Sequence, residues 1–291
     1  MAGIQTNRTA IDLPTEVSSE IIQKTQESSA VMQLARGITL PGRGLTIPVI
    51  TEDPTAAWVG ETEKKPVSNP GLSQKVMRGY KLAVIVPFSN QFRRDEAALY
   101  DAIIERIPGV LGAKFDNTVF GGTAAPGSDF DNLASVNAHS LSSDPYQGLV
   151  DADTDISMNG GETNGFVISP QAKGILLGAT DKNDRPLFIN SVQEGAIPVI
   201  LGSPTYIKKA AYIAGSPNIV GFAGDWSKAV YGIVEGVEIA FSSDATLELA
   251  NGTTVNLFQQ NMFAVRAEIE IGFRAETECF TKITASSVPS F

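Results

Sequence analysis

The sequence predicts a mixed α+β fold, and three patterns support that prediction. Over residues 263–274 an apolar residue stands at every second position, and most of the residues between them are charged, which is typical of one long half-buried strand. Residues 95–107 carry an apolar stripe at helical spacing. From Gly165 onward, short strand-like and helix-like segments alternate. The 27 glycines and 16 prolines add to the expectation of many strands and turns.

Two extensions are expected ahead of the predicted helix. Residues 1–13 are typical of an extended arm, and a helix is expected to start at Pro14 and to end at Gly37 at the latest. Farther on, alternating residues predict strands over 45–49 and 72–88, joined by a polar segment. Together they form a long hairpin. Because a two-stranded hairpin is only marginally stable alone, we expect it to lie on a neighbouring subunit.

The middle of the chain is expected to contain an interrupted helix. Pro108 and Gly109 should kink or break it, because proline removes a backbone hydrogen bond and clashes with the preceding turn. Helical character resumes near Leu111 and runs to Phe120, and a loop is expected over 121–147. The strands and helices expected after that loop are a strand at 166–169, a helix at 170–178, a strand at 197–200 and strands within 219–240.

The net charge of −10 argues against a dedicated DNA-reading protein, which usually has a basic face. It does not exclude a container for DNA. Residues 1–80 hold eight basic and eight acidic residues, so the remaining 14 basic and 24 acidic residues carry the whole −10. A neutral N-terminal part would suit extensions that lie against acidic neighbours, and a chance distribution is an equal alternative.

The chain has one cysteine, Cys279, and one histidine, His139, which limits its chemistry. A single cysteine excludes an internal disulfide, and the two residues do not make a typical structural zinc site. A Ser-His-Asp or Cys-His catalytic group would depend on His139, which we expect in a loop. Cys279 is expected in a strand rather than as a reactive thiol. Trp58 and Trp226 are expected to be buried or contact-forming rather than ligand-stacking.

Other familiar motifs are missing or incomplete. The sequence has no phosphate-binding GxxxxGK[ST] motif, and its glycine pairs lack the strand–GxGxxG–helix setting of a dinucleotide site. Asp151, Asp153 and Asp155 resemble the start of a calcium loop, but Ile156 stands where that loop needs glycine. No secretory signal and no apolar stretch of membrane-spanning length is found. We therefore expect a soluble protein that matures without export and needs no metal or cofactor.

Eight segments follow one another between about residues 14 and 284. They are PTEVSSEIIQKTQESSAVMQLAR, IPVIT, AAWVGETEKKPVS, YKLAVIVPFSNQ, VFGGTAAPG, FVISPQAKGILLGATDKNDRPLF, GFAGDWSKAVYGI and QNMFAVRAEIEIGF. In this order they resemble the HK97-type major capsid protein family of tailed double-stranded DNA phages. Two features depart from the family pattern. Pro108-Gly109 interrupts a spine helix that is usually longer, and the chain starts almost at the arm, which implies a separate scaffold protein or none.

The resemblance implies an HK97-like capsid fold with five parts. Residues 1–36 would form the N-terminal arm, and residues 37–88 the extended hairpin called the E-loop. Residues 89–147 and 241–291 would form the peripheral domain with its spine helix. Residues 148–240 would form the axial domain.

The resemblance implies a structural protein of the virion rather than an enzyme. Hexamers and pentamers would assemble in the host cytoplasm into an icosahedral head that encloses double-stranded DNA non-specifically, with no membrane. Its other partners would be a portal and, as open alternatives, a separate scaffold or decoration protein. Trp58, near the hairpin tip, is expected to pack on an adjacent subunit. The alternatives are an encapsulin-like nanocompartment shell, and an α/β binding protein or enzyme whose catalytic cluster the sequence does not show.

The resemblance also implies a cross-linking site, because some members of the family join subunits through Lys-Asn isopeptide bonds. Placed by motif, the lysine is Lys65, with Lys64 as a substitute, the asparagine is Asn261 and the helping glutamate is Glu268. A desolvated lysine is a nucleophile, and a glutamate can move the proton. Seven residues of strand span about 23 Å, so the three groups would meet only between subunits. Ordinary surface and packing roles are the alternative.

Overall fold

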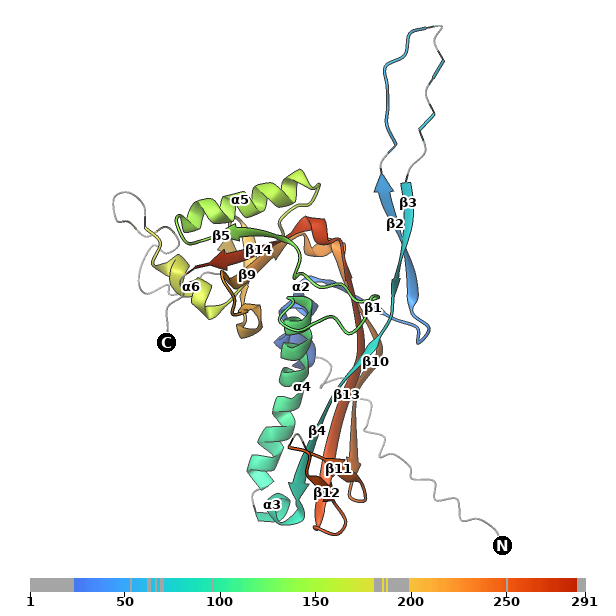
Figure 1. Ribbon diagram of the computed structural model, residues 1–291, viewed down its shortest axis with the longest axis vertical. Coiled ribbons are helices and arrows are strands. Elements are labelled where there is room, and N and C mark those ends of the chain that lie inside the picture. Colours follow the sequence, from blue (N-terminus) through green and yellow to red (C-terminus); the bar gives the residue numbers. More distant parts are fainter. Residues whose placement is uncertain are drawn as a thin grey trace.

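The computed structural model describes residues 24–52, 54–61, 64–65, 67–68, 71–95, 97–180, 185, 187, 199–249 and 251–286. The arm expected over residues 1–13 lies outside these ranges. The described elements form two sheets, a long helix beside one of them, and a hairpin that extends away from the body (Figure 1). Within these ranges, no helix is both long enough and apolar enough to cross a membrane.

The first sheet has four strands. Their order is β1 (Arg36–Thr39), β10 (Ala229–Ser242), β13 (Met262–Ala275) and β4 (Tyr80–Ser89). β1 runs parallel to β10, and the other neighbours are antiparallel. The strand predicted over 263–274 is confirmed as β13, an inner strand, and most of its apolar residues are buried.

One face of this sheet packs against α4 (Ala97–Val119), which runs alongside it (Figure 1). Ile107 and Leu111 of α4 are buried among apolar side chains of β4, β10 and β13. The expected break at Pro108 and Gly109 is wrong, because the helix continues through both residues. Burial of an apolar side chain on each side contributes about 1.5–3 kcal/mol, which offsets the ~3 kcal/mol cost of an internal proline.

The extended hairpin consists of β2 (Leu45–Glu52) and β3 (Gly71–Met77), which pair antiparallel. The prediction of one continuous strand over 72–88 is wrong. The chain leaves the hairpin at Gly79 and continues as β4 in the first sheet. A Cβ atom at Gly79 would lie 2.5 Å from Cγ2 of Val234, so a glycine suits this close crossing.

The chain enters the first sheet through a bent helical segment. Residues 24–28 are helical, Ser29 interrupts the helix, and α2 (Ala30–Leu34) follows. The helical segment ends at Leu34, within the limit expected at Gly37. Gly37 itself lies in β1 and pairs with Tyr231 of β10. In β1 the backbone forms hydrogen bonds with β10, and these replace the hydrogen bonds that a continued helix would have made.

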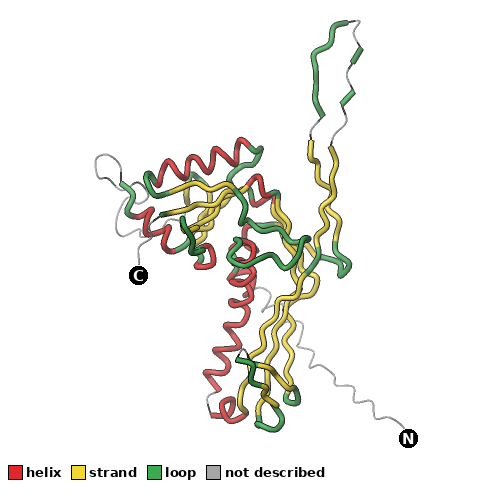
Figure 2. Tube along the Cα trace, in the orientation of Figure 1, coloured by secondary structure: helices red, strands yellow, loops and turns green. Residues whose placement is uncertain are grey.

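The second sheet lies beside the C-terminal end of α4 (Figures 1 and 2). Its strands, in order across the sheet, are β5 (Asn137–Ser140), β14 (Phe280–Ala285), β9 (Asn218–Gly224), β6 (Gly165–Ile168), β8 (Ser203–Ile207) and β7 (Val199–Ile200). One of its faces is covered by α5 (Pro145–Met158) and α6 (Pro170–Leu177). The strand and helix predicted over 166–178 are confirmed as β6 and α6. The segment 121–147, predicted to be a loop, also contains β5 and the start of α5.

Short elements complete the described fold. They are α3 (Asn90–Asp95), β11 (Thr246–Glu248), β12 (Thr254–Asn256), and the 3-10 turns η1 (Lys209–Ala211), η2 (Trp226–Lys228) and η3 (Thr277–Cys279). The hairpin β11–β12 closes the end of the first sheet far from β2 and β3 (Figure 1).

A shared aromatic core joins the two sheets. Phe120, just beyond α4, stacks on Phe222 of β9 with ring centroids 4.8 Å apart. Trp226 is 1% exposed, and its indole N–H donates to the Gly165 carbonyl at 3.0 Å. The expectation that Trp226 is buried is confirmed. The helix, both sheets and η2 therefore meet in one body, from which the β2–β3 hairpin extends.

Candidate functional site

The hairpin tip carries exposed apolar and basic side chains. Trp58 has a relative exposure of 104% and Val67 one of 87%, while Lys64 and Lys65 are exposed beside them. The Thr55 N–H donates to the Ser68 hydroxyl at 2.8 Å, and this hydrogen bond links the two sides of the tip. An indole left in water forgoes a large apolar burial, so the exposed tip is a candidate contact surface.

Asn261 lies in the turn immediately before β13, far from that tip (Figure 1). Its φ of +53° is in the left-handed region, which asparagine tolerates better than most residues. Its backbone carbonyl accepts a hydrogen bond from the Asn90 N–H at 3.1 Å. The side-chain amide of Asn90 donates to Oδ1 of Asn261 at 2.8 Å. These two contacts orient the exposed carboxamide.

Glu268 lies midway along β13 on the face opposite α4. It is held by two cations of its own chain: Lys81 Nζ is 3.6 Å from one carboxylate oxygen, and Arg266 Nε is 3.3 Å from the other. The Glu268 side chain is 17% exposed. A lysine arriving from another subunit would therefore meet a carboxylate that is already paired.

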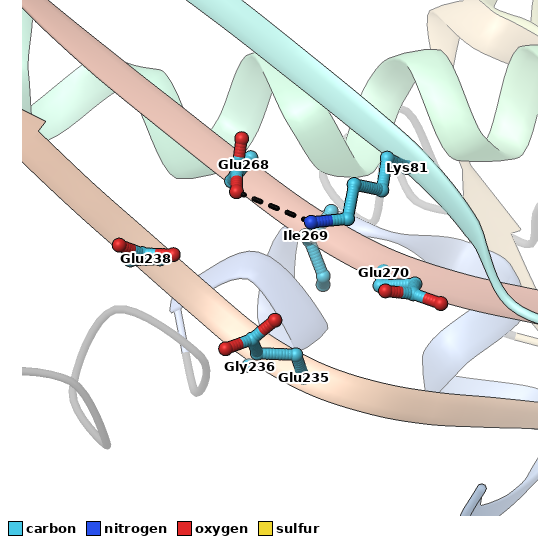
Figure 3. Close-up of a pocket in the computed structure, with 7 residues that line it drawn as sticks. All are labelled: Lys81, Glu235, Gly236, Glu238, Glu268, Ile269 and Glu270. Atoms are coloured by element: carbon cyan, nitrogen blue, oxygen red, sulfur yellow. Dashed lines mark ion pairs between the residues drawn. The ribbon is translucent and has the colours of Figure 1, made fainter. Parts of the chain in front are cut away.

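The surroundings of Glu268 form a shallow acidic pocket on this open face (Figure 3). The residues that line it, drawn from β4, β10 and β13, are Lys81, Glu235, Gly236, Glu238, Glu268, Ile269 and Glu270. Four carboxylates face one lysine, so the pocket has an excess of negative charge. Among the described residues, no group of His, Cys, Asp and Glu side chains has an arrangement that could hold a metal ion.

The structure does not bring Lys65, Asn261 and Glu268 together within one chain. Glu268 lies in β13 seven residues after Asn261, and seven residues of extended strand span about 23 Å. The hairpin tip extends beyond the opposite end of the first sheet (Figure 1). Any reaction among these three residues therefore needs more than one subunit.

The structure also places the other residues that the sequence analysis singled out. Asp151, Asp153 and Asp155, whose resemblance to a calcium loop was incomplete, lie on α5. His139 lies in β5 rather than in a loop, and its Nε2 is 3.0 Å from Asp155 Oδ2. The hydrogen bond with His139 is the largest cause of the lowered pKa of Asp155.

Cys279 was expected in a strand, and it lies instead in η3, immediately before β14. Its side chain is fully buried, and burial raises the pKa of the thiol. A buried thiol with a raised pKa is less reactive, which agrees with the expectation that Cys279 is structural.

Comparison with known proteins decides the family. The sequence profile of the phage capsid family matches residues 10–281. The chain belongs to the phage capsid family. It is an HK97-type major capsid protein, a structural component of the virion shell rather than an enzyme.

Two curated relatives carry the same role in their names. The chain is 29% identical over 294 residues to the probable major capsid protein of Mycobacterium phage L5, covering 94% of this chain and 89% of that protein. It is 26% identical to the major capsid protein of Staphylococcus phage 80alpha, covering 93% of this chain and 84% of the relative.

Solved structures support the fold. A chain from Mycobacterium phage Ogopogo matches with a TM-score of 0.76 at 16% identity, covering 88% of this chain and 92% of that one. A chain from Microbacterium phage Oxtober96 matches with a TM-score of 0.73 at 21% identity, covering 88% and 91%. At these identities the likeness shows the HK97-like fold and leaves the partners of this capsid protein open.

Proposed function

We propose that this capsid protein assembles as hexamers and pentamers into a closed icosahedral head that encloses double-stranded DNA. The observation that carries the proposal is the β2–β3 hairpin. It leaves the body at Gly79 and holds Trp58 fully exposed at its tip. Subunits that bury such extensions on their neighbours form interfaces of the obligate class, typically above ~2,000 Å².

We propose the following division into parts. The arm comprises residues 1–36, the E-loop 37–88, the peripheral domain 89–147 with 241–291, and the axial domain 148–240. In this division β2 and β3 are the E-loop and α4 is the spine helix. Strand pairing joins these parts: β10, numbered mostly with the axial domain, pairs with β13 in the first sheet, and β14, numbered with the peripheral domain, pairs with β9 in the second.

The proposed contact with DNA is non-specific. A net charge of −10 disfavours tight binding to a dense polyanion, which suits a container wall. We further propose a portal as a partner, together with a separate scaffold or decoration protein, on the basis of the family resemblance.

We propose cross-linking between subunits as a second property. Nζ of Lys65 on one subunit would attack Cγ of Asn261 on another, forming an amide bond and releasing ammonia. Glu268 lies far from both Asn261 and the hairpin tip of its own chain, so it would come from a third subunit and carry the lysine proton to the leaving nitrogen. The exposed Lys65 and the oriented Asn261 carboxamide support this proposal. Because Lys81 and Arg266 each pair with one carboxylate oxygen of Glu268, at least one of these ion pairs would have to break before Glu268 could take the proton.

Two measurements test these proposals separately. Negative-stain images of the purified full-length protein are expected to show closed shells with five-fold and six-fold clusters. A stable compact monomer at high concentration would contradict the shell proposal.

Denaturing electrophoresis of mature particles is expected to show ladders or material too large to enter the gel. Particles in which both Lys64 and Lys65 are replaced by arginine would revert to a single band near 30.8 kDa, with Lys114→Arg, an exposed lysine on α4, as the matched control. A single band in the parent would end the cross-linking proposal and leave the shell proposal standing.

A further inference from the structure

The bend in the N-terminal segment is fixed by two charged residues of the body. The segment is helical over 24–28, stops at Ser29, and resumes as α2. The N–H groups that open the second piece have no acceptor within their own helix, and the last carbonyls of the first piece accept hydrogen bonds from a side chain of the body. Each end is met by a side chain of the charge that its dipole favours.

Asp116 of α4 meets the N–H groups. Its carboxylate accepts from the Ala30 N–H at 2.8 Å and the Val31 N–H at 3.3 Å. The Ser29 hydroxyl also donates to it, while the same Ser29 oxygen accepts from the Met32 N–H at 3.1 Å. Asp116 is 1% exposed, so its carboxylate is shielded from water and has protein groups as its hydrogen-bond partners.

Lys208, between β8 and η1, meets the carbonyls. Its Nζ donates to the Ser28 carbonyl at 2.7 Å and to the Glu27 carbonyl at 3.4 Å. The two body residues thus grip consecutive residues of the arm from opposite sides of the interruption. One is on the spine helix, and the other belongs to the second sheet.

The backbone packing confirms how close this contact is. A Cβ atom added at Gly112, one turn before Asp116, would lie 2.3 Å from the Ser28 hydroxyl and 3.0 Å from the Thr25 carbonyl. Glycine at this position lets the arm reach the Asp116 carboxylate. No sequence pattern marks Asp116, since an isolated aspartate inside a helix resembles an ordinary surface residue.

We propose that Asp116 and Lys208 form a clamp that sets the bend of the N-terminal arm, and that this clamp closes more tightly when the Asp116 carboxyl group takes up a proton. The hydroxyl of Ser29 suits both states of the clamp. It donates to the ionised carboxylate, and it can turn to accept the proton of the neutral carboxyl group.

The direction of the pH effect follows from burial. Desolvation raises the pKa of Asp116 from 3.8 to about 6, although the hydrogen bonds from Ser29, Ala30 and Val31 and the charge of Lys208 oppose the rise. An arm that lifts off would return the carboxyl group to water and to its ordinary pKa. The extra stability of the closed clamp is therefore full below the ordinary value and is lost as pH rises through about 6.

Other charges on the elements packed around Asp116 set the background. They are Lys24 and Glu27 on the arm, Lys209 beside Lys208, and Glu105 and Lys114 on α4. Lys24 and Glu105 form an ion pair at 3.4 Å. The positive charge of Lys208 lowers the pKa of Asp116, so removal of that charge should raise the pKa further.

Hydrogen–deuterium exchange of the full-length chain tests the clamp. Protection of peptides covering residues 24–35, corrected for intrinsic exchange, is expected to be about tenfold higher at pH 5 than at pH 7. A peptide from β13 serves as the internal reference. Because the readout lies within one chain, it succeeds or fails independently of the proposed shell architecture.

Two variants and one control sharpen the test. Asp116→Asn is expected to lower protection and remove its pH dependence. The asparagine amide does not titrate, and its NH₂ group would face the Ser29 hydroxyl and the Ala30 and Val31 N–H groups, which are themselves donors. Lys208→Met is expected to lower protection and move the midpoint above pH 6, while Lys209→Met should leave both unchanged. Flat protection across this range in the parent, or a midpoint that Lys208→Met does not move, would overturn the proposal.

Discussion

Replacing Trp58 with alanine should separate folding of the subunit from assembly of the shell. In the subunit the indole is 104% exposed, so its removal costs the folded chain almost nothing. On a neighbouring subunit, an aromatic side chain buries about 150–250 Å², and each Å² contributes about 25 cal/mol. The proposed contact is thus worth about 4–6 kcal/mol per subunit.

Scanning calorimetry of assembled particles and of dissociated subunits measures both effects. Trp58→Ala particles are expected to form in lower yield or to melt well below the parent, while the subunit transition stays in place. Trp226→Ala is the matched control, since Trp226 is 1% exposed and should cost the subunit about 3–5 kcal/mol. Trp58→Ala particles that form in parental yield and melt at the parental temperature would refute the reasoning.

Two substitutions test the fold, and one binding measurement tests the container role. Gly79→Ala should destabilise the subunit by about 1–3 kcal/mol, because the new Cβ would lie 2.5 Å from Val234 Cγ2; an unchanged denaturation midpoint would contradict the close crossing. Gly109→Ala should stabilise the subunit by about 0.5–1 kcal/mol in the same assay, because alanine favours the helix and nothing lies within 4 Å of the added Cβ atom. A loss of stability would contradict the prediction that the added methyl group meets no neighbour. Binding of the isolated subunit to duplex DNA should be weak, independent of sequence and steeply reduced by salt in a titration; salt-insensitive, selective binding would contradict a passive wall.

Regular periodicity was the part of the fold that the sequence could predict. The run over 263–274 became β13 because a half-buried strand imposes strict alternation on its side chains. The prediction of a broken helix at Pro108 failed because a local rule competes with packing that lies far away in sequence. Ile107 and Leu111 are buried on either side of the proline, and that burial holds α4 together.

The hairpin shows a second limit of local patterns. Alternation continues from the hairpin into the first sheet, so the run over 72–88 looked like one strand. The crossing at Gly79 is decided by contact with Val234 of β10, which no local window contains. The clamp was missed for the same reason: Asp116 meets Ala30 and Val31 across 85 or more residues of chain.

The candidate site was predictable in type and unpredictable in geometry. The exposed Lys65 and Trp58 follow from a polar, strand-flanked tip. The pairing of Glu268 with Lys81 and Arg266 depends on strand register, which places Lys81 of β4 opposite Glu270 and beside Glu268. Strand register is not visible in the local sequence. The sequence therefore predicted Glu268 as a candidate but not its ion pairs with Lys81 and Arg266.

The direction of the hairpin is set at its base, inside the subunit. Arg274 of β13, 12% exposed, donates from both Nε and a terminal nitrogen to the Val76 carbonyl near the end of β3, at 2.8 and 2.6 Å. Lys75 Nζ donates to the Ala275 carbonyl at 3.2 Å. At the start of β2, Gly44 adopts a φ of +83°, and a Cβ there would lie 2.6 Å from the Met77 carbonyl. With β3 held to the first sheet and β2 paired closely to β3 at Gly44, the body fixes the direction of the tip. The side chains at the tip then have to supply only the chemistry of the proposed contact with a neighbouring subunit.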